Sequence, residues 1–356
     1  MNRSIGRGFA AIGIVGTVVS TAPAMTFNVT NAGGASPQMV SAFTQATALW
    51  SARFNDPIII NIRIDSTNQP AGVAGHTDSF FDPYLYTDVR GALLNDRTTA
   101  DDLSSTNSLQ AGSVFSMLIN KTANNPNGVV SATPYFDTGL GGPGQAGPEN
   151  NNTVRITSAN AKAIGLYPAD SAGLDGIITF SNLNVFDFDR SNGINGAQVD
   201  FVGVAAHEIG HLLGFISGVD TLAGNAAAPG KLDNQLRFVT PIDLLRFSTR
   251  SIAAGPGVID WTADDAGKYF SVDGGATPLA AFSTGAVYEE SHWQNGMGLG
   301  LMNPTVQKAV VLGFSNNDLR AFDAIGYNLI PEPTSFALLG LASCMRLNRT
   351  RNPVRA

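Results

Sequence analysis

The hydrophobic positions near the N-terminus change from a strand pattern to a helical one and back. Residues 25–30 (MTFNVT) and 57–64 (PIIINIRI) have the apolar runs of strands, and the second run alternates toward its end. Between them, residues 36–54 place apolar side chains at helical spacing, with Pro37 near the expected first turn. A strand, a helix and a second strand predict a crossover in a mainly parallel or mixed sheet.

Residues 201–215, FVGVAAHEIGHLLGF, are apolar on nearly every face of a helix and contain no proline. Their apolar side chains form two stripes at helical spacing: Ala205, Ile209 and Leu212, and Val202, Ala206 and Leu213. A helix that is apolar nearly all round is a buried one. His207, Glu208 and His211 are therefore predicted to be polar groups held inside a core.

The remaining pattern predicts an α+β fold rich in loops. Residues 66–82 and 121–152 are expected to be loops, the second because it gathers Gly, Pro and Asn. Residues 215–291 show little regular pattern except for a hairpin around 273–275. The other expected elements are helices at 84–94, at 112–119 and within 154–166, a strand at 176–186, a short helix or strand at 240–250, and a closing helix followed by a strand within 315–330.

Composition and charge narrow the class of protein. The chain is 44% hydrophobic, which suffices for a core, and its 39 glycines and 18 prolines argue against a helical bundle. Residues 25–345 carry a net charge of −13, from 15 basic and 28 acidic residues, and such a surface repels nucleic acid. The only cysteine, Cys344, lies in the C-terminal tail, so the folded part has neither a disulfide nor a thiolate ligand.

The first 24 residues have the pattern of a secretory signal peptide. Arg3 and Arg7 precede an apolar core at 9–19, and a small-x-small site follows, with cleavage expected after Ala24. The apolar core is shorter than the roughly 20 residues that a membrane-spanning helix needs. We therefore expect export, and no stable transmembrane span in the mature protein.

The C-terminal segment, residues 331–356, has a tripartite order. Pro331-Glu332-Pro333 precedes an apolar run at 336–345 and a basic tail, RLNRTR. This order resembles the PEP-CTERM sorting signal of bacterial envelope and extracellular proteins. The resemblance implies recognition and removal by exosortase-type sorting machinery, and a secreted or cell-surface location.

His207-Glu208-Ile209-Gly210-His211 matches the H-E-x-x-H pattern of zinc hydrolases. Residues four apart share a helix face, so His207 and His211 can present two imidazole nitrogens to one metal ion. Glu208 is next to the first ligand, where its carboxylate can take a proton from a metal-bound water. The pattern predicts one catalytic Zn²⁺ with Glu208 as general base.

The third protein ligand is not settled by this pattern. No glutamate lies between His211 and Glu289, which argues against a thermolysin-like layout, and Ser217 stands where the short metzincin motif H-E-x-x-H-x-x-G-x-x-H has its last histidine. A serine hydroxyl is a poor zinc ligand. The candidates that remain are His76, Asp220 and His292.

The combination H-E-x-x-H-x-x-G-F, a long insertion, S-H-W at 291–293 and L-M-N-P at 301–304 resembles the leishmanolysin-like metzincins. The resemblance implies that His292 completes the zinc site with His207 and His211, and that Met302 is the Met-turn residue below the metal. It also implies a secreted zinc endopeptidase acting on protein or peptide substrates. The chain departs from that group in having no disulfides. The whole layout looks like a bacterial metalloprotease family that carries a PEP-CTERM signal.

These patterns divide the chain into a catalytic subdomain at 25–214 and a C-terminal subdomain at 215–330. The first would hold a mixed, twisted sheet and the active-site helix of a metzincin-like α+β fold. The second, rich in loops, would supply the third ligand and the Met-turn.

Several alternatives stay open. Residues 187–198 begin like a calcium loop but lack its Gly and Glu, so a calcium ion has weak support and a plain turn is the simpler prediction. Trp293 can be a packing residue or a substrate contact. An envelope structural or adhesive protein with the same fold would not need Glu208, and a zinc hydrolase of non-peptide bonds would keep the same motif.

Overall fold

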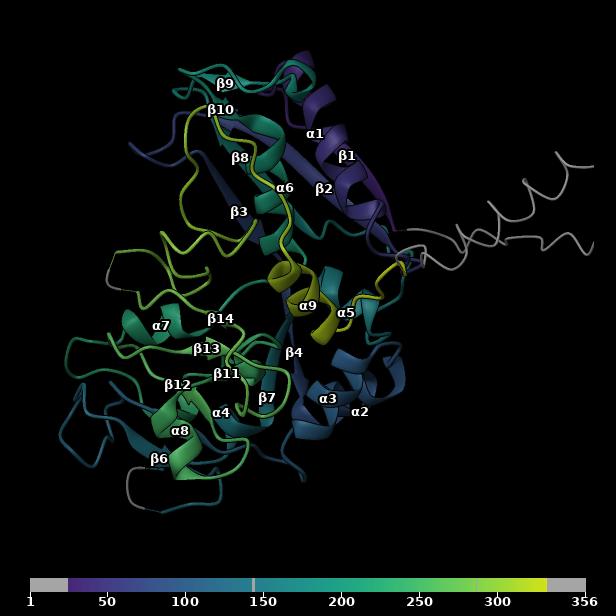
Figure 1. The fold of residues 1–356 in the computed structure, drawn as a ribbon. Coiled ribbons are helices and arrows are strands. Elements are labelled where there is room, and N and C mark those ends of the chain that lie inside the picture. The colour runs from purple at the N-terminus through teal and green to yellow at the C-terminus, as the bar shows by residue number, and fades with distance from the viewer. Residues whose placement is uncertain (1–24, 143–144, 286, 332–356) are drawn as a thin grey trace, which may run out of the picture.

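The computed structural model describes residues 25–142, 145–285 and 287–331 (Figure 1). The two segments predicted to be sorting signals, 1–24 and nearly all of 331–356, lie outside the described residues. Among the helices of the described part, none is long and apolar enough to cross a membrane.

A four-stranded sheet forms the upper part of the molecule in Figure 1. Its strands, in spatial order, are β1 (Thr26–Asn31), β2 (Ile59–Thr67), β8 (Gly176–Ser181) and β3 (Gly75–Ser79). The first three are parallel, and β3 runs antiparallel to β8 at the edge of the sheet. The strands predicted at 25–30 and 57–64 are confirmed, and the one predicted at 176–186 ends earlier, at Ser181. The sheet is mixed, as expected.

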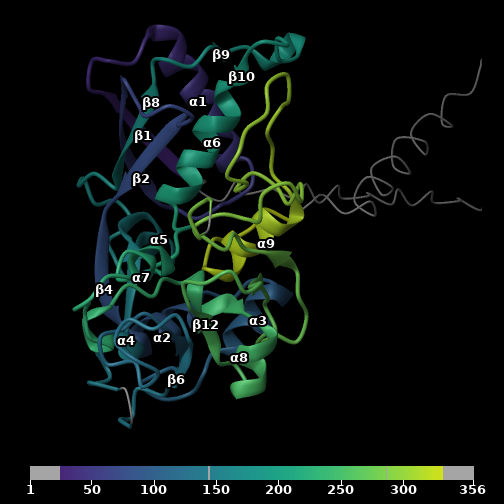
Figure 2. The same ribbon diagram turned by 90° about the vertical axis from the view of Figure 1, so that its left-hand side faces the viewer.

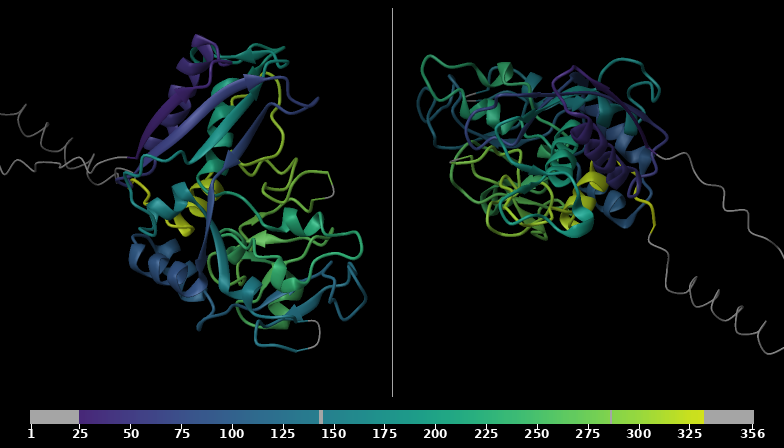
Figure 3. Two further views of the ribbon diagram at one scale, coloured as in Figure 1. Left: turned by 180° about the vertical axis from the view of Figure 1, so that it is seen from behind. Right: turned by 90° about the horizontal axis from the view of Figure 1, so that it is seen from above.

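Two helices, α1 (Pro37–Ser51) and α6 (Phe201–Leu212), cover the same face of this sheet (Figures 1 and 3). Ser36 caps α1 by accepting a hydrogen bond from the backbone N–H of Met39, which explains where this helix begins. Helix α1 connects the parallel strands β1 and β2, so the predicted crossover is confirmed.

Trp50, near the end of α1, ties this helix to α6. Its side chain is fully buried, and its indole Nε1 donates a hydrogen bond of 3.1 Å to the backbone oxygen of Ala206. The ring packs edge-on against Phe322 of α9 (Asn316–Ala324), with 4.6 Å between ring centroids. One aromatic side chain therefore joins the N-terminal helix, the histidine-bearing helix and the closing helix.

The lower half of the molecule is built from short strands, short helices and loops (Figure 2). Its helices are α2 (Tyr86–Asp96), α3 (Ala100–Ser108), α4 (Glu149–Asn152), α5 (Ser158–Ala163), α7 (Val219–Ala223) and α8 (Thr249–Ala254), and its strands are β4 (Phe81–Leu85), β5 (Met117–Ile119), β6 (Tyr135–Asp137), β7 (Thr153–Thr157), β11 (Arg246–Phe247), β12 (Ile259–Trp261), β13 (Tyr269–Phe270) and β14 (Ala280–Ala281). Two further strands, β9 (Phe186–Asp187) and β10 (Val199–Asp200), pair beside α6. A second hydrophobic core in this half combines residues from both sides of position 214.

Strand pairing overturns the predictions for three segments. Residues 112–119 do not form a helix, because 117–119 pair as β5 with β6 and β12. Residues 66–82 and 121–152 were expected to be loops, but they contain β3 and β6. In each case pairing with another strand outweighs local preference, which is the usual weakness of strand propensity. The short helix predicted within 154–166 is confirmed as α5, which follows strand β7.

The end of the described chain follows the prediction more closely. Helix α9 begins at a capping box formed by Ser315 and Asp318. The strand expected after it is reduced to an isolated bridge between Leu329 and Phe54.

The predicted hairpin around 273–275 is confirmed by the antiparallel pair β13 and β14. The fold is thus α+β with several small sheets.

We expect Trp50→Ala to lower the free energy of unfolding by about 3–5 kcal/mol, because it leaves a cavity between three helices. Phe80→Ala is the matched control, since the Phe80 side chain is 43% exposed and should cost less than about 1 kcal/mol. Urea denaturation of both variants measures the difference. Equal losses in the two variants would contradict a central role for Trp50.

Candidate metal centre

Helix α6 carries His207, Glu208 and His211, and all three line one cleft. His207 and His211 are one helical turn apart, and their imidazole rings are separated by 4.7 Å between centroids. The helix turns away directly after this point, because Gly214 has a φ of +115°, a value that favours glycine. The chain therefore leaves the site just after the second histidine.

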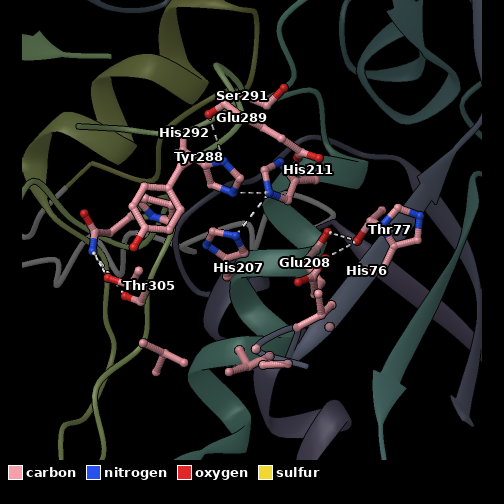
Figure 4. Close-up of a pocket in the computed structure, with 18 of the residues that line it drawn as sticks. His76, Thr77, His207, Glu208, His211, Tyr288, Glu289, Ser291, His292 and Thr305 are labelled. Carbon is pink, nitrogen blue, oxygen red and sulfur yellow. Dashed lines mark hydrogen bonds between the residues drawn. The ribbon is translucent and has the colours of Figure 1, made fainter. Parts of the chain in front are cut away.

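His292 reaches the same place from a loop far along the chain. The loop closes on itself: Phe282 and Trp293 form an antiparallel bridge, and the N–H of Ser283 donates to the backbone oxygen of His292. The three histidine rings point toward one another (Figure 4). One nitrogen of each of His207, His211 and His292 lies within 4.8 Å of the others, a grouping that can hold a metal ion.

Hydrogen bonds define which nitrogen of each ring is free. Each Nδ1 lies next to a backbone carbonyl oxygen: His207 next to Leu301 (2.8 Å), His211 next to Phe215 (2.8 Å) and His292 next to Glu289 (3.2 Å). Carbonyl oxygens only accept, so each Nδ1 carries the hydrogen. The Nε2 lone pairs are then directed at one another, at 3.1 Å between His207 and His211 and 3.2 Å between His211 and His292.

This arrangement of lone pairs is repulsive unless a cation lies between them. Burial lowers the pKa of His211 well below its ordinary value and that of His292 to about 3, and neighbouring histidines add to both shifts. Both rings are therefore neutral near pH 7, which is the form that binds metals. Tetrahedral metal–nitrogen bonds of about 2.0–2.1 Å separate neighbouring nitrogens by roughly 3.3 Å, close to the spacing seen here. The residues present fit a metal ion.

The other two candidate ligands lie outside this group. His76 is on β3 with an exposed side chain, and its Nε2 lies 3.2 Å from the carboxylate of Asp78. Asp220 binds protein groups instead: its carboxylate accepts hydrogen bonds from the N–H of Glu290 (2.7 Å) and the hydroxyl of Ser291 (2.6 Å). Asp220 thus holds the two residues that precede His292.

Arg246 holds the same loop from the other side. Its guanidinium donates to the Glu290 carboxylate at 3.0 Å and to the Glu290 backbone oxygen at 2.6 Å, and both side chains are buried. Ser217, the residue at the end of the short metzincin motif, donates through its hydroxyl to Asp243 at 2.6 Å. Its backbone N–H donates to Ser291. Ser217 therefore also supports the His292 loop.

Met302 lies fully buried against Gly210 of α6. A Cβ on Gly210 would lie 2.4 Å from the sulfur of Met302, so the Met302 side chain would have to shift to accommodate it. Asp318 of α9 holds the turn at Leu301 and Met302. Its carboxylate accepts hydrogen bonds from the backbone N–H of Leu301 (2.7 Å) and of Met302 (3.2 Å). Its carboxylate also accepts from the indole of Trp293 at 2.8 Å.

Trp293 is a packing residue. It is fully buried and stacks on Phe282 with 5.1 Å between ring centroids, while Phe215 meets it edge-on at 4.7 Å. The alternative interpretation, a substrate contact, is wrong for the conformation described, because no part of the ring reaches the surface. Trp293 instead fixes the chain directly after His292.

The three-histidine group opens into a cleft of about 780 Å³. The cleft is lined by residues 71–77, 287–289, 291–292 and 303–306, among others. Glu208 lines the cleft, and its carboxylate lies 2.6 Å from the hydroxyl of Thr77. Burial raises the pKa of Glu208, although His207 and the Thr77 hydroxyl oppose this shift. A buried carboxylate next to a metal position is suited to accept a proton.

Residues 187–198, which resemble a calcium loop, do not bring three or more metal-binding side chains together. Asp187 accepts hydrogen bonds from the N–H of Asp189 and Asn195, and Asp189 accepts one from the N–H of Ser191. These bonds close turns around a short 3-10 helix at Arg190–Asn192. Within the described ranges, the three-histidine group is the one place where three or more His, Cys, Asp or Glu side chains come together closely enough to hold a metal ion. A plain turn accounts for this segment.

Comparison with known proteins gives no further assignment: no family model, curated protein or solved structure matches this chain. The geometry of the site is therefore what points to a function for this protein.

The motif identified His207, Glu208 and His211, but several supporting residues were missed. Thr77, Asp318 and Arg246 stand in segments without a motif, and each reaches the site through a contact with a residue distant in sequence. A capping box at 315–318 was the one signal available for Asp318, and it indicated a helix start rather than a support for Met302.

We expect His292→Ala to lose bound zinc on dialysis, because one of three ligands contributes several kcal/mol of the roughly 10–16 kcal/mol known for structural zinc sites. Asp220→Ala should retain zinc more weakly than the unchanged protein, since only the support of the loop is lost. His76→Ala is the control and should retain zinc fully. Metal analysis after dialysis decides, and full occupancy in His292→Ala would exclude His292 as a ligand.

Gly210→Ala should destabilise the protein through its clash with Met302. Overpacking costs about 1–3 kcal/mol, and the better helix propensity of alanine offsets about 1 kcal/mol of it. In a Met302→Ala background the same change should be neutral or stabilising. Gly91→Ala on α2 is the matched control, because a Cβ there meets nothing within 4 Å. Denaturation curves that show no coupling between positions 210 and 302 would refute this contact.

Proposed function

We propose that this protein is a zinc-dependent endopeptidase. The observation that carries the proposal is the convergence of three imidazole rings and the Glu208 carboxylate in one open cleft. Three nitrogen ligands with an open fourth position are typical of catalytic zinc, whereas structural zinc has four protein ligands. Within the described residues, the histidine group has three members, which leaves that fourth position to the cleft.

Zinc bound to these histidines would lower the pKa of a water molecule and polarise the carbonyl of a substrate. Glu208 takes a proton from the water as the water oxygen bonds to the peptide carbonyl carbon. The same carboxyl group then gives the proton to the peptide nitrogen as the C–N bond breaks. One water molecule is consumed, and a carboxylic acid and an amine are released.

A peptide is the substrate class that the cleft favours. Strand β3 forms one wall and lies at the edge of its sheet, with β8 on its other side. An edge strand can pair with an extended peptide through its free backbone groups, and this places a peptide bond alongside the metal position. A hydrolase of non-peptide bonds would gain nothing from such a wall.

The resemblance to the leishmanolysin-like metzincins supports the same proposal. The S-H-W and L-M-N-P segments that suggested it contain His292, which lies next to the pair, and Met302, which lies against Gly210 of α6. We further propose export through the N-terminal signal and sorting through the C-terminal one, which would place the substrates outside the cytoplasm.

We expect Glu208→Ala and Glu208→Gln to retain zinc while losing peptide cleavage, because the ligands remain and the base is gone. The loss should be about 10²–10⁴-fold in kcat, the usual contribution of general acid–base catalysis. Cleavage of a mixed peptide library, followed by mass spectrometry with and without a chelator, measures it.

A near-native rate in either variant would exclude Glu208 as the base. If the unchanged protein with full zinc occupancy cleaved no peptide, the proposed function would be wrong. An adhesive or structural protein, or a hydrolase of other bonds, would then be favoured.

A further inference from the structure

Strand β3 contacts helix α6 through alternate residues. Gly75, Thr77 and Ser79 all face α6: a Cβ on Gly75 would lie 2.8 Å from the Glu208 side chain, Thr77 contacts Glu208, and the Ser79 hydroxyl lies 3.4 Å from the His211 backbone oxygen. His76, between the first two, is exposed. The face toward α6 thus carries only small residues, which allows the strand to lie close to the carboxylate.

The hydroxyl of Thr77 has two acceptors on Glu208, the carboxylate oxygen Oε2 at 2.6 Å and the backbone oxygen at 3.0 Å. A hydroxyl has one hydrogen to donate. The carboxyl oxygen is the closer acceptor, at 2.6 Å against 3.0 Å for the backbone oxygen. Within the described residues, Thr77 is the one group that donates a hydrogen bond to this carboxylate.

The position of Thr77 is set by strand register. Residue 77 lies opposite Ile178 of β8, and the antiparallel pairing runs from Gly75 to Ser79. Side chains alternate along a strand, so a slip by one residue would put His76 or Asp78 against Glu208. Pairing between β3 and β8 therefore brings a neutral donor to the carboxylate.

We propose that Thr77 is a positioning residue, whose hydroxyl holds the Glu208 carboxylate in the orientation that proton transfer requires, in the space that Gly75 leaves open. The proposal rests on the proposed function. Glu208 has several rotatable bonds, and α6 fixes only its backbone. A base displaced by about 1 Å can lose about 10²-fold in rate. Thr77 acts through Glu208 and does not itself exchange a proton.

The test compares Thr77→Val, which keeps the shape but removes the donor, with Thr77→Ser, which keeps the donor. Thr77→Val should lose about 10–100-fold in kcat, with KM and zinc content within about twofold of the unchanged protein. Thr77→Ser should stay within about threefold. Thr179→Val on β8 is the matched control: residue 179 pairs with His76, so its side chain lies on the face away from α6.

Gly75→Ala gives a second, independent variant. Its Cβ would push the carboxylate aside, so kcat should fall while zinc content is kept. Crystal structures of Thr77→Val and Gly75→Ala should both show the Glu208 carboxylate displaced, a readout that does not depend on activity.

Native kcat in Thr77→Val, equal losses in the Val and Ser variants, a loss of zinc, or an unmoved carboxylate would each overturn the role of Thr77 while leaving the proposed function intact. Absence of cleavage by the unchanged, zinc-loaded protein would overturn both.

Discussion

Three imidazole nitrogens with unshared lone pairs face one another inside this protein, and much of its structure serves to hold them there. Backbone carbonyls take the Nδ1 hydrogens of all three rings, so the Nε2 atoms have no hydrogen to share. Burying polar atoms without partners is costly. A metal ion removes that cost by binding all three, which couples the stability of the site to metal binding.

Two glycines let neighbouring segments approach the histidine-bearing helix closely. Gly210 makes room for Met302, and Gly75 makes room for the side chain of Glu208 next to strand β3. Both close contacts depend on the absence of a Cβ rather than on conformational freedom. Helix α6 is thereby in contact with both the edge strand of the sheet and the turn at Met302.

The third histidine depends on a different kind of support. The loop that carries it has little regular structure, and buried charged groups replace the backbone hydrogen bonds of a strand or helix. Asp220 accepts hydrogen bonds from Glu290 and Ser291, and Arg246 binds the Glu290 side chain and backbone. Such buried pairs are costly to break from one side.

The sequence by itself determined the parts whose information is local. A strong apolar pattern predicted the crossover through α1 and the buried helix α6, and spacing alone paired His207 with His211 on one helix face. It left His76, Asp220 and His292 as open choices for the third position. Tertiary structure brought only His292 to the pair, because the segment from residue 211 to 292 contains short helices, strands and loops that are held in place by contacts of Asp220, Arg246 and Trp293. The strands β3 and β5 were missed for the same physical reason: strand pairing and buried ion pairs draw their energy from partners far along the chain, and no local pattern records them.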